Sequence, residues 1–269
     1  MTQPSLTFLK LGGSLITDKQ QALTAQSATI LRLAKEIRSS INEQPDLHLL
    51  IGHGSGSFGH GVAVQYQTQA GEKGPGYWQG FAAVWAAARE LNQIVIQHLS
   101  SQNLPVIAFP PSAGIVASDK ILETWDVLPI KLAIEHQLIP IVQGDVVFDI
   151  KIGGTIFSTE QVFQHLCKML QPNRILIAGL EHGVYLDPKK PQEVIPRITP
   201  RNFCSIVPAI SGAGTADVTG GMLSKVQLML ELIKNHPALE VQIFSGVTPG
   251  NVHKVLSGEK LGTLITAVD

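Results

Sequence analysis

Short runs of apolar residues alternate along the chain with longer segments in which apolar residues recur every three or four positions. The short runs predict buried strands, and the longer segments predict amphipathic helices. We expect strands at 6–11, 47–51, 106–109, 139–142, 174–178, 241–244 and 262–267. We expect helices at 24–41, 77–99, 127–137, 159–170 and 221–235, and a hairpin formed by 146–149 and 155–158.

This alternation is typical of a mainly parallel sheet covered by helices. It predicts an α/β fold, a three-layer αβα sandwich in one compact unit of two lobes, 1–170 and 171–269. Residues 185–213 contain five prolines and little periodicity, so we expect a lid or excursion there rather than core.

Composition narrows the class of protein. Hydrophobic residues make up 44% of the 269 residues, charged residues 15%, and the formal net charge is −1, which gives no support to a nucleic-acid or membrane-surface partner. The two cysteines form no CxxC pair, and the N-terminus lacks a basic segment followed by an apolar one, so we expect a cytoplasmic protein with reduced thiols. The nine histidines are scattered, so we expect no metal site built from protein ligands.

Three glycine-rich turns are the main candidates for chemistry, and two of them follow predicted strands. They lie at 10–14, 52–61 and 211–225. The carboxyl ends of parallel strands are where open α/β sheets bind ligands, and glycine lets backbone N–H groups approach a phosphate. One such turn is weak support for a phosphate site, because turns between a strand and a helix often need glycine for steric reasons alone. Three turns, two of them with lysines, indicate a phosphate site.

Lysines accompany the first turn. Lys10 lies within the apolar run of Phe8, Leu9 and Leu11, and a buried lysine needs an anionic partner. It is either an edge-strand lysine that reaches water or a cation directed at phosphate oxygens. Lys19 follows nine residues later. Phosphoryl transfer needs positioning and charge neutralisation more than covalent help from the protein.

The second turn contains three glycines within residues 53–60, which can form a nest for an anion. His60 ends this turn near a helix start, where it either binds phosphate or caps the helix. His53 is more consistent with a satisfied histidine at a strand end. In the third turn Asp217 and Thr219 can cap the next helix, with Lys225 about one turn inside it, although an ordinary glycine hinge also fits. Walker A, HRD, DFG and GxSxG motifs are absent.

Four segments in this order, LKLGGSLITDK, GHGSGSFGH, QGDVVFD and ADVTGGMLSK, resemble the amino acid kinase superfamily, and within it the isopentenyl phosphate kinases. The resemblance covers nearly the whole chain. Acetylglutamate and uridylate kinases are similar mainly in the first turn. The resemblance implies the amino acid kinase fold, with 1–170 binding a phosphate acceptor and 171–269 the nucleotide. It also implies ATP with Mg²⁺, a small phosphate substrate and a homodimer.

The resemblance implies a role for each matching position. Catalytic roles fall on Lys10, Lys19 and His60. The nucleotide falls to Lys10, Gly12, Gly13, Ser14, Gly56, Leu180, Gly221 and Lys225. The acceptor falls to Gly54, Ser55, His60, Thr159, Phe81 and Trp85. Asp145 is expected to organise the structure. An acceptor phosphate oxygen is already ionised, so no general base is required.

Two departures from the family pattern leave the acceptor open. SGDD becomes residues 158–161, STEQ, and the aspartate of TDVDGVY becomes Leu180. The hydroxyls of Ser158 and Thr159 look somewhat like those of fosfomycin kinases. The leading hypothesis is therefore phosphorylation of isopentenyl phosphate. The alternatives are a fosfomycin-like kinase and a catalytically weak binding protein.

The resemblance also implies that the helix 77–99 forms an apolar wall for a short acceptor tail, because members of that family place the isoprenoid against the corresponding helix. Phe81, Val84 and Trp85 fall at i, i+3 and i+4, so they can share one face. This apolar stripe is either that wall or ordinary core packing.

Overall fold

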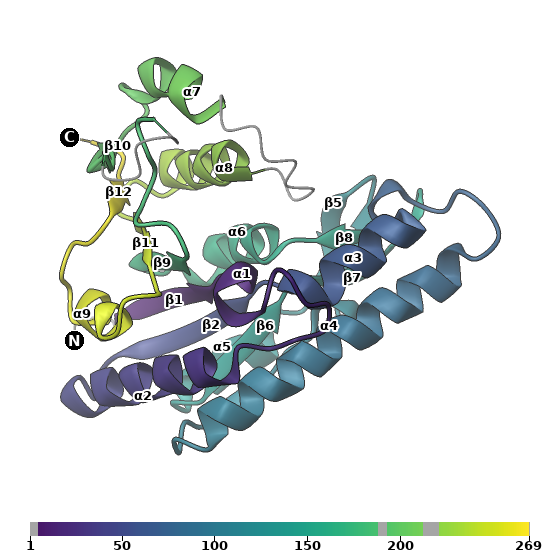
Figure 1. Cartoon of the computed structure of the whole chain (residues 1–269), viewed down its shortest axis with the longest axis horizontal. Coiled ribbons are helices and arrows are strands. Elements are labelled where there is room, and N and C mark those ends of the chain that lie inside the picture. Colours follow the sequence, from purple (N-terminus) through teal and green to yellow (C-terminus); the bar gives the residue numbers. More distant parts are fainter. Residues whose placement is uncertain (1–4, 188–192, 212–220, 269) are drawn as a thin grey trace.

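A sheet of eight strands forms the middle layer of the computed structural model, which describes residues 5–187, 193–211 and 221–268 (Figure 1). Its neighbouring strands pair in parallel except β11 and β12. In spatial order the strands are β10 (Arg197–Ile198), β12 (Thr263–Ile265), β11 (Glu240–Ser245), β9 (Arg174–Gly179), β1 (Leu6–Leu11), β2 (His48–His53), β6 (Ile139–Gln143) and β3 (Val106–Ala108). The prediction of a mainly parallel sheet is confirmed, and the sheet continues from β1 to β9 across the expected lobe boundary.

Helices cover both faces of this sheet, which confirms the three-layer αβα sandwich. The cluster on one face includes side chains of α5 (Leu128–Glu135), α6 (Thr159–Leu170), α7 (Phe203–Ser211) and α8 (Gly221–Asn235). The cluster on the other face includes side chains of α1 (Gly13–Ile16), α2 (Ser27–Glu43), α3 (Gly56–Tyr66), α4 (Tyr77–Ser100) and α9 (Asn251–Leu256). Short 3₁₀ turns form at Thr68–Ala70 and Pro111–Ala113. In the part of the chain that the structure describes, no helix is both long and apolar enough to span a membrane.

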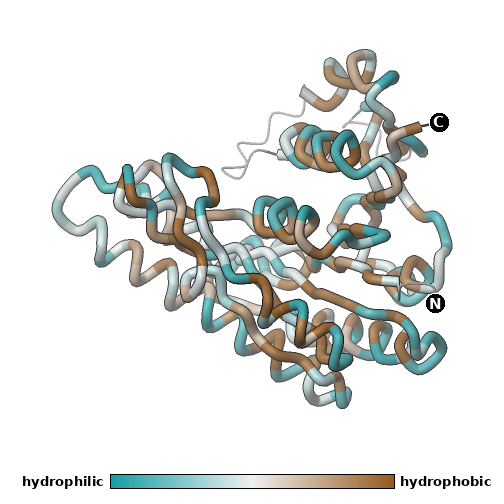
Figure 2. Tube along the Cα trace, turned by 180° about the vertical axis from the view of Figure 1, so that it is seen from behind, coloured by the Kyte–Doolittle hydropathy of each residue, from teal (hydrophilic) through white to brown (hydrophobic). Residues whose placement is uncertain are grey.

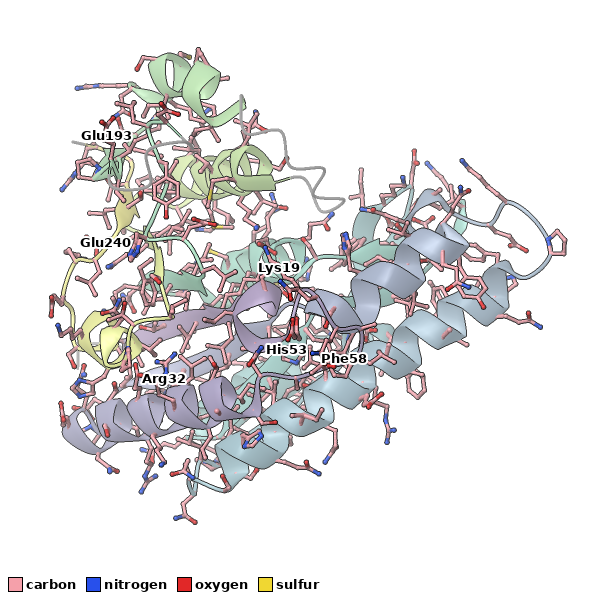
Figure 3. All side chains as sticks on the ribbon, in the orientation of Figure 1. Lys19, Arg32, His53, Phe58, Glu193 and Glu240 are labelled. Atoms are coloured by element: carbon pink, nitrogen blue, oxygen red, sulfur yellow. The ribbon has the colours of Figure 1, made fainter. Side chains whose placement is uncertain are left out.

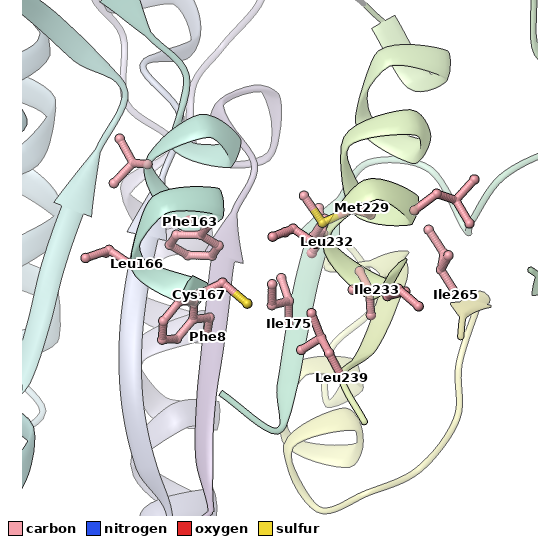
Figure 4. Close-up of a cluster of buried hydrophobic side chains, with 14 of the residues drawn as sticks. Phe8, Phe163, Leu166, Cys167, Ile175, Met229, Leu232, Ile233, Leu239 and Ile265 are labelled. Atoms are coloured by element: carbon pink, nitrogen blue, oxygen red, sulfur yellow. The ribbon is translucent and has the colours of Figure 1, made fainter. Parts of the chain in front are cut away.

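The alternation of side chains along β1 decides what each residue faces. Phe8 belongs to the cluster beneath α6 and α8, and its ring centroid lies 5.1 Å from that of Phe163 (Figure 4). Leu9 and Leu11 belong to the opposite cluster, which α2 and α4 cover. Lys10 therefore faces the same side as Phe8, toward α6, because alternate residues share a face of a strand. Figure 2 shows the hydrophobic central strands between helices with hydrophilic outer positions.

A second, four-stranded sheet lies at one end of the first, in the order β5 (Ile121–Thr124), β4 (Val116–Ser118), β7 (Asp145–Asp149) and β8 (Gly153–Phe157). The antiparallel pair β7–β8 confirms the expected hairpin, whereas β4 and β5 were not predicted. The Asp149 carboxylate joins the two turns of this sheet by accepting hydrogen bonds from four backbone N–H groups, at Asp119, Lys120, Lys151 and Ile152. Residues 185–213 include β10 and α7, so part of the expected excursion is regular structure.

Candidate active site

The first two glycine turns are in direct backbone contact at the carboxyl ends of β1 and β2. The N–H of Gly54 donates to the carbonyl of Leu11 over 3.1 Å. A Cβ on Gly13 would lie 2.5 Å from the nitrogen of Gly56, and a Cβ on Gly54 would lie 2.9 Å from the nitrogen of Gly13. Side chains cannot occupy those positions, so glycine is required for the turns to meet. Two phosphate groups bound at these turns would therefore be neighbours.

The second turn runs directly into α3, which begins at Gly56. Gly56 has a φ of +48°, a conformation that favours glycine. The first N–H groups of a helix have no partner within it and carry a partial positive charge, which favours an anion. His60 lies on the second turn of α3, and Gly54, Ser55 and His60 are all partly exposed. The structure thus brings three expected acceptor residues to one helix start.

Lys10 and Glu160 form a buried ion pair beside the first turn. Each residue is only 6% exposed, and the Lys10 Nζ contacts the Glu160 Oε1. Burial raises the pKa of Glu160, but the nearby ammonium groups of Lys10 and then Lys225 outweigh this effect and lower the pKa below its usual value. Lys225 on α8 is therefore electrostatically part of the same group of charges. Lys10 and Lys225, two of the expected nucleotide-binding residues, and the carboxylate of Glu160 on α6 thus form one group of interacting charges.

The sequence STEQ at residues 158–161 forms the start of α6. The Ser158 hydroxyl accepts from the N–H of Gln161, and the Gln161 side chain accepts from the N–H of Ser158, which is a capping box. Thr159 is buried, and its hydroxyl donates to the carbonyl of His53 over 2.7 Å. Both hydroxyls are therefore engaged in holding local structure.

His53 is a buried, hydrogen-bonded histidine beneath the second turn, as its position at a strand end predicted. Its Nε2 lies 3.0 Å from the Asn92 Oδ1 of α4, and its Nδ1 lies 3.2 Å from the carbonyl oxygen of Gly54. Burial lowers the pKa of its imidazole. His53 thus supports the turn from below, while His60 remains accessible above it.

The remaining expected residues lie around these turns. Gly12 and Gly13 are partly exposed, and Ser14 and Lys19 are exposed; Figure 3 shows Lys19 in the middle of the molecule, near α1. Leu180 follows β9 and is 38% exposed. Gly221 opens α8 with a φ of +60°. The expected caps Asp217 and Thr219 fall outside the described residues.

The three side chains of the apolar stripe on α4 differ in burial. Phe81 and Val84 are buried against Val146, but Trp85 is 40% exposed and lies under the guanidinium of Arg89, 5.7 Å from the ring centroid. At about 100° per residue, Trp85 lies about 80° from the middle of the buried face. Trp85 therefore lies at the exposed edge of the face that contains Phe81 and Val84, rather than within its buried part.

Comparison with known proteins shows the family of this chain. The model of the amino acid kinase family matches residues 5–245. The chain belongs to that family. Isopentenyl phosphate kinase of Methanocaldococcus jannaschii is 33% identical over 97% of this chain and 98% of its own length, and that of Methanothermobacter thermautotrophicus is 30% identical over 97% and 99%. An X-ray structure of isopentenyl phosphate kinase superposes with a TM-score of 0.81 at 29% identity, covering 97% of this chain and all of the other.

For this member of the amino acid kinase family, sequence reasoning missed one charged residue of the site, Glu160. The signal that could have found it was Lys10, whose apolar strand already required an anionic partner. Alternation along β1 directs Lys10 toward α6, and Glu160 is the acidic residue on the first turn of that helix.

Proposed function

We propose that this chain transfers the γ-phosphoryl group of ATP to isopentenyl phosphate, giving isopentenyl diphosphate and ADP. The observation that carries the proposal is the contact between the turns at Gly13 and Gly54, which would place a donor phosphate next to an acceptor phosphate. The similarity to isopentenyl phosphate kinases over nearly the whole chain supports this choice of acceptor.

The reaction joins an oxygen of the acceptor phosphate to the γ-phosphorus of ATP and breaks the bond between that phosphorus and the oxygen bridging to the β-phosphate. The acceptor oxygen is already ionised near neutral pH, so no side chain has to remove a proton. Catalysis then depends on position and on neutralising the negative charge of the phosphates. The chain supplies backbone N–H groups at two turns and the ammonium groups of Lys10, Lys19 and Lys225 for this purpose.

The individual roles follow the two turns. Lys10, Gly12, Gly13, Ser14 and Gly56 would contact the ATP phosphates. Gly221 and Lys225 would lie near these phosphates, and Leu180 would lie near the nucleotide. The acceptor phosphate would be held by Gly54, Ser55, His60 and Thr159. The hydroxyl of Thr159 would keep its hydrogen bond to the carbonyl of His53. Lys19 would stabilise the group in transfer. In this assignment residues 1–170 bind the acceptor and residues 171–269 bind the nucleotide.

Mg²⁺ is the expected partner of the ATP phosphates. Among the described residues no group of three or more histidine, cysteine or acidic side chains could hold a metal ion, and the acidic residue beside the first turn, Glu160, is paired with Lys10. Mg²⁺ usually keeps several waters and binds through substrate phosphates with one or two carboxylates, so the ATP phosphates and water would supply most of its ligands here. When bound, it would neutralise phosphate charge.

We further propose a cytoplasmic homodimer that serves isoprenoid biosynthesis and binds neither nucleic acid nor membranes. The net charge of −1 supports the absence of an electrostatic attraction to polyanions. Sedimentation equilibrium on the purified chain tests the dimer directly.

The kinase proposal is tested by a phosphoryl-transfer screen with ATP. The acceptors are isopentenyl phosphate, dimethylallyl phosphate, geranyl phosphate, fosfomycin and acetylglutamate. We expect the highest kcat/KM with isopentenyl phosphate. A preference for fosfomycin would refute the proposed acceptor, and no turnover with any of the five would favour a binding protein. The hydroxyls of Ser158 and Thr159, which suggested fosfomycin, are both engaged within the protein.

A further inference from the structure

Thr17 lies between the two glycine turns, immediately after α1. Its side chain is buried, with only 2% of the residue exposed. Its hydroxyl donates to the carbonyl of Gly13 over 2.8 Å and accepts from the N–H of Ser57 over 3.0 Å. One hydroxyl therefore joins the turn after β1 to the first turn of α3.

The bond to Ser57 replaces a missing helix cap. Ser55 occupies the N-cap position of α3, but its side chain makes no capping hydrogen bond. The N–H of Ser57 is one of the first donors of the helix, and such groups need a partner from outside it. Thr17, forty positions earlier in the chain, provides that partner. The side chain that caps the start of α3 thus comes from the end of α1 rather than from the helix's own N-cap residue.

The Thr17 hydroxyl leaves no space for a side chain at Gly56. A Cβ on Gly56 would lie 2.1 Å from the Thr17 Oγ1 and 2.6 Å from the carbonyl oxygen of Gly13. The lack of a side chain at Gly56 is therefore what admits the hydroxyl. Thr17 is also tied to the segment that carries Lys19, because it forms an isolated bridge with Ala25 and Asp18 donates to the carbonyl of Thr24 over 2.9 Å.

We propose that Thr17 is a positioning residue that sets the separation between the donor and acceptor phosphates. The inference rests on the proposed kinase function, since it assigns the donor to the turn at Gly13 and the acceptor to the start of α3. Thr17 itself need not touch either substrate. Each half of the site could bind its ligand without the hydroxyl, but the two halves would no longer be held at one distance. A displacement of about 1 Å can reduce turnover by about a hundredfold.

The test compares Thr17→Val, which removes the hydroxyl at similar volume, with Thr17→Ser, which keeps it. We expect Thr17→Val to lower kcat by about tenfold to a hundredfold, while calorimetric Kd values for a non-hydrolysable ATP analogue and for isopentenyl phosphate, each measured alone, change by less than about threefold. Thr17→Ser should recover most of the lost kcat.

Thr263→Val is the matched control. The buried Thr263 makes the same pair of bonds, donating to the carbonyl of Ile195 over 2.7 Å and accepting from the N–H of Val184 over 2.8 Å. It should lower the melting temperature about as much as Thr17→Val without the loss of kcat at saturating substrates. If Thr17→Val does not fold, Thr17→Ala replaces it in the same comparison.

Several results would overturn the inference. They are an unchanged kcat in a folded Thr17→Val, binary affinities that fall as much as kcat, or an equal loss of kcat in Thr263→Val. Failure of the kinase proposal is distinguishable, because then wild type itself would not phosphorylate isopentenyl phosphate. Hydrogen exchange at the Ser57 amide, measured by NMR without substrates, still applies in that case. Faster exchange in Thr17→Val supports the bridge, and unchanged exchange refutes it.

Discussion

Glu160→Gln should lower the free energy of unfolding by about 3 kcal/mol at pH 7, because it removes the carboxylate that is paired with Lys10 inside the protein. Breaking a buried pair by removing one partner typically costs about 3–5 kcal/mol. The side chains of Lys10 and Glu160 are both 8% exposed, so solvent screens the pair little. Glutamine retains an oxygen that can accept a hydrogen bond from the ammonium, which favours the lower end of the range.

The assay is urea unfolding followed by circular dichroism, with Glu240→Gln as the control. Glu240 pairs with Lys260 at the surface, where the two side chains are 41% and 49% exposed, so its loss should cost less than about 1 kcal/mol. A change below about 1 kcal/mol in Glu160→Gln, or equal changes in the two variants, would refute the reasoning. The double variant Lys10→Met with Glu160→Leu should regain much of the stability, since it removes both buried charges.

The pH dependence gives this prediction a definite sign. The folded protein lowers the pKa of Glu160 below 4.5, so the unfolded chain takes up the proton first as the pH falls. The stability from the ionised carboxylate is complete well above pH 4.5 and is lost as the pH falls through the folded pKa. The difference between wild type and Glu160→Gln should therefore shrink below pH 4.5. A difference that stays constant down to acid unfolding would contradict an ionised Glu160.

Three further predictions concern catalysis and the acceptor. Lys19→Ala should lower kcat by about a hundredfold or more with little change in ATP affinity, and steady-state kinetics showing only a raised ATP KM would contradict this role. His60→Ala should weaken acceptor binding selectively in calorimetry, and His60→Gln should recover part of the loss because a neutral hydrogen bond remains. Phe81→Ala should raise the ratio of kcat/KM for geranyl over isopentenyl phosphate and lower the free energy of unfolding by about 3–5 kcal/mol, whereas the exposed Trp85→Ala should change neither. Equal effects of Phe81→Ala and Trp85→Ala on this ratio and on the free energy of unfolding would refute the assignment of Phe81 to the buried face of α4 and Trp85 to its exposed edge.

The features that sequence reasoning predicted correctly depend on neighbours along the chain. The core strands follow from short apolar runs, and α6 follows from the helical periodicity of residues 159–170. Lys10 could be singled out because the residues on both sides of it are apolar.

What could not be predicted depends on contacts between distant segments. A helix start was expected near His60, but α3 already begins at Gly56. That earlier start was not predicted, because glycine is a poor helix former and the cap comes from Thr17 in another element. The pairing of Lys10 with Glu160 depends on how α6 lies over β1. The exposure of Trp85 depends on which position of α4 marks the boundary between its buried and exposed faces. The spacing of apolar residues predicts that boundary only to within one residue.

Contacts between distant segments also explain why the candidate site depends on buried hydroxyl, imidazole and amide side chains next to its glycine turns. The groups expected to bind phosphate are mostly backbone N–H groups of glycines, and glycine has no side chain by which packing could hold it in place. Their positions must therefore be set by neighbours that bond to the backbone. Thr17 bonds to the carbonyl of Gly13, and Thr159 bonds to the carbonyl of His53. The ring of His53, held by Asn92, lies against the carbonyl of Gly54. Loss of these buried bonds should therefore impair transfer even where every group expected to touch a phosphate is intact.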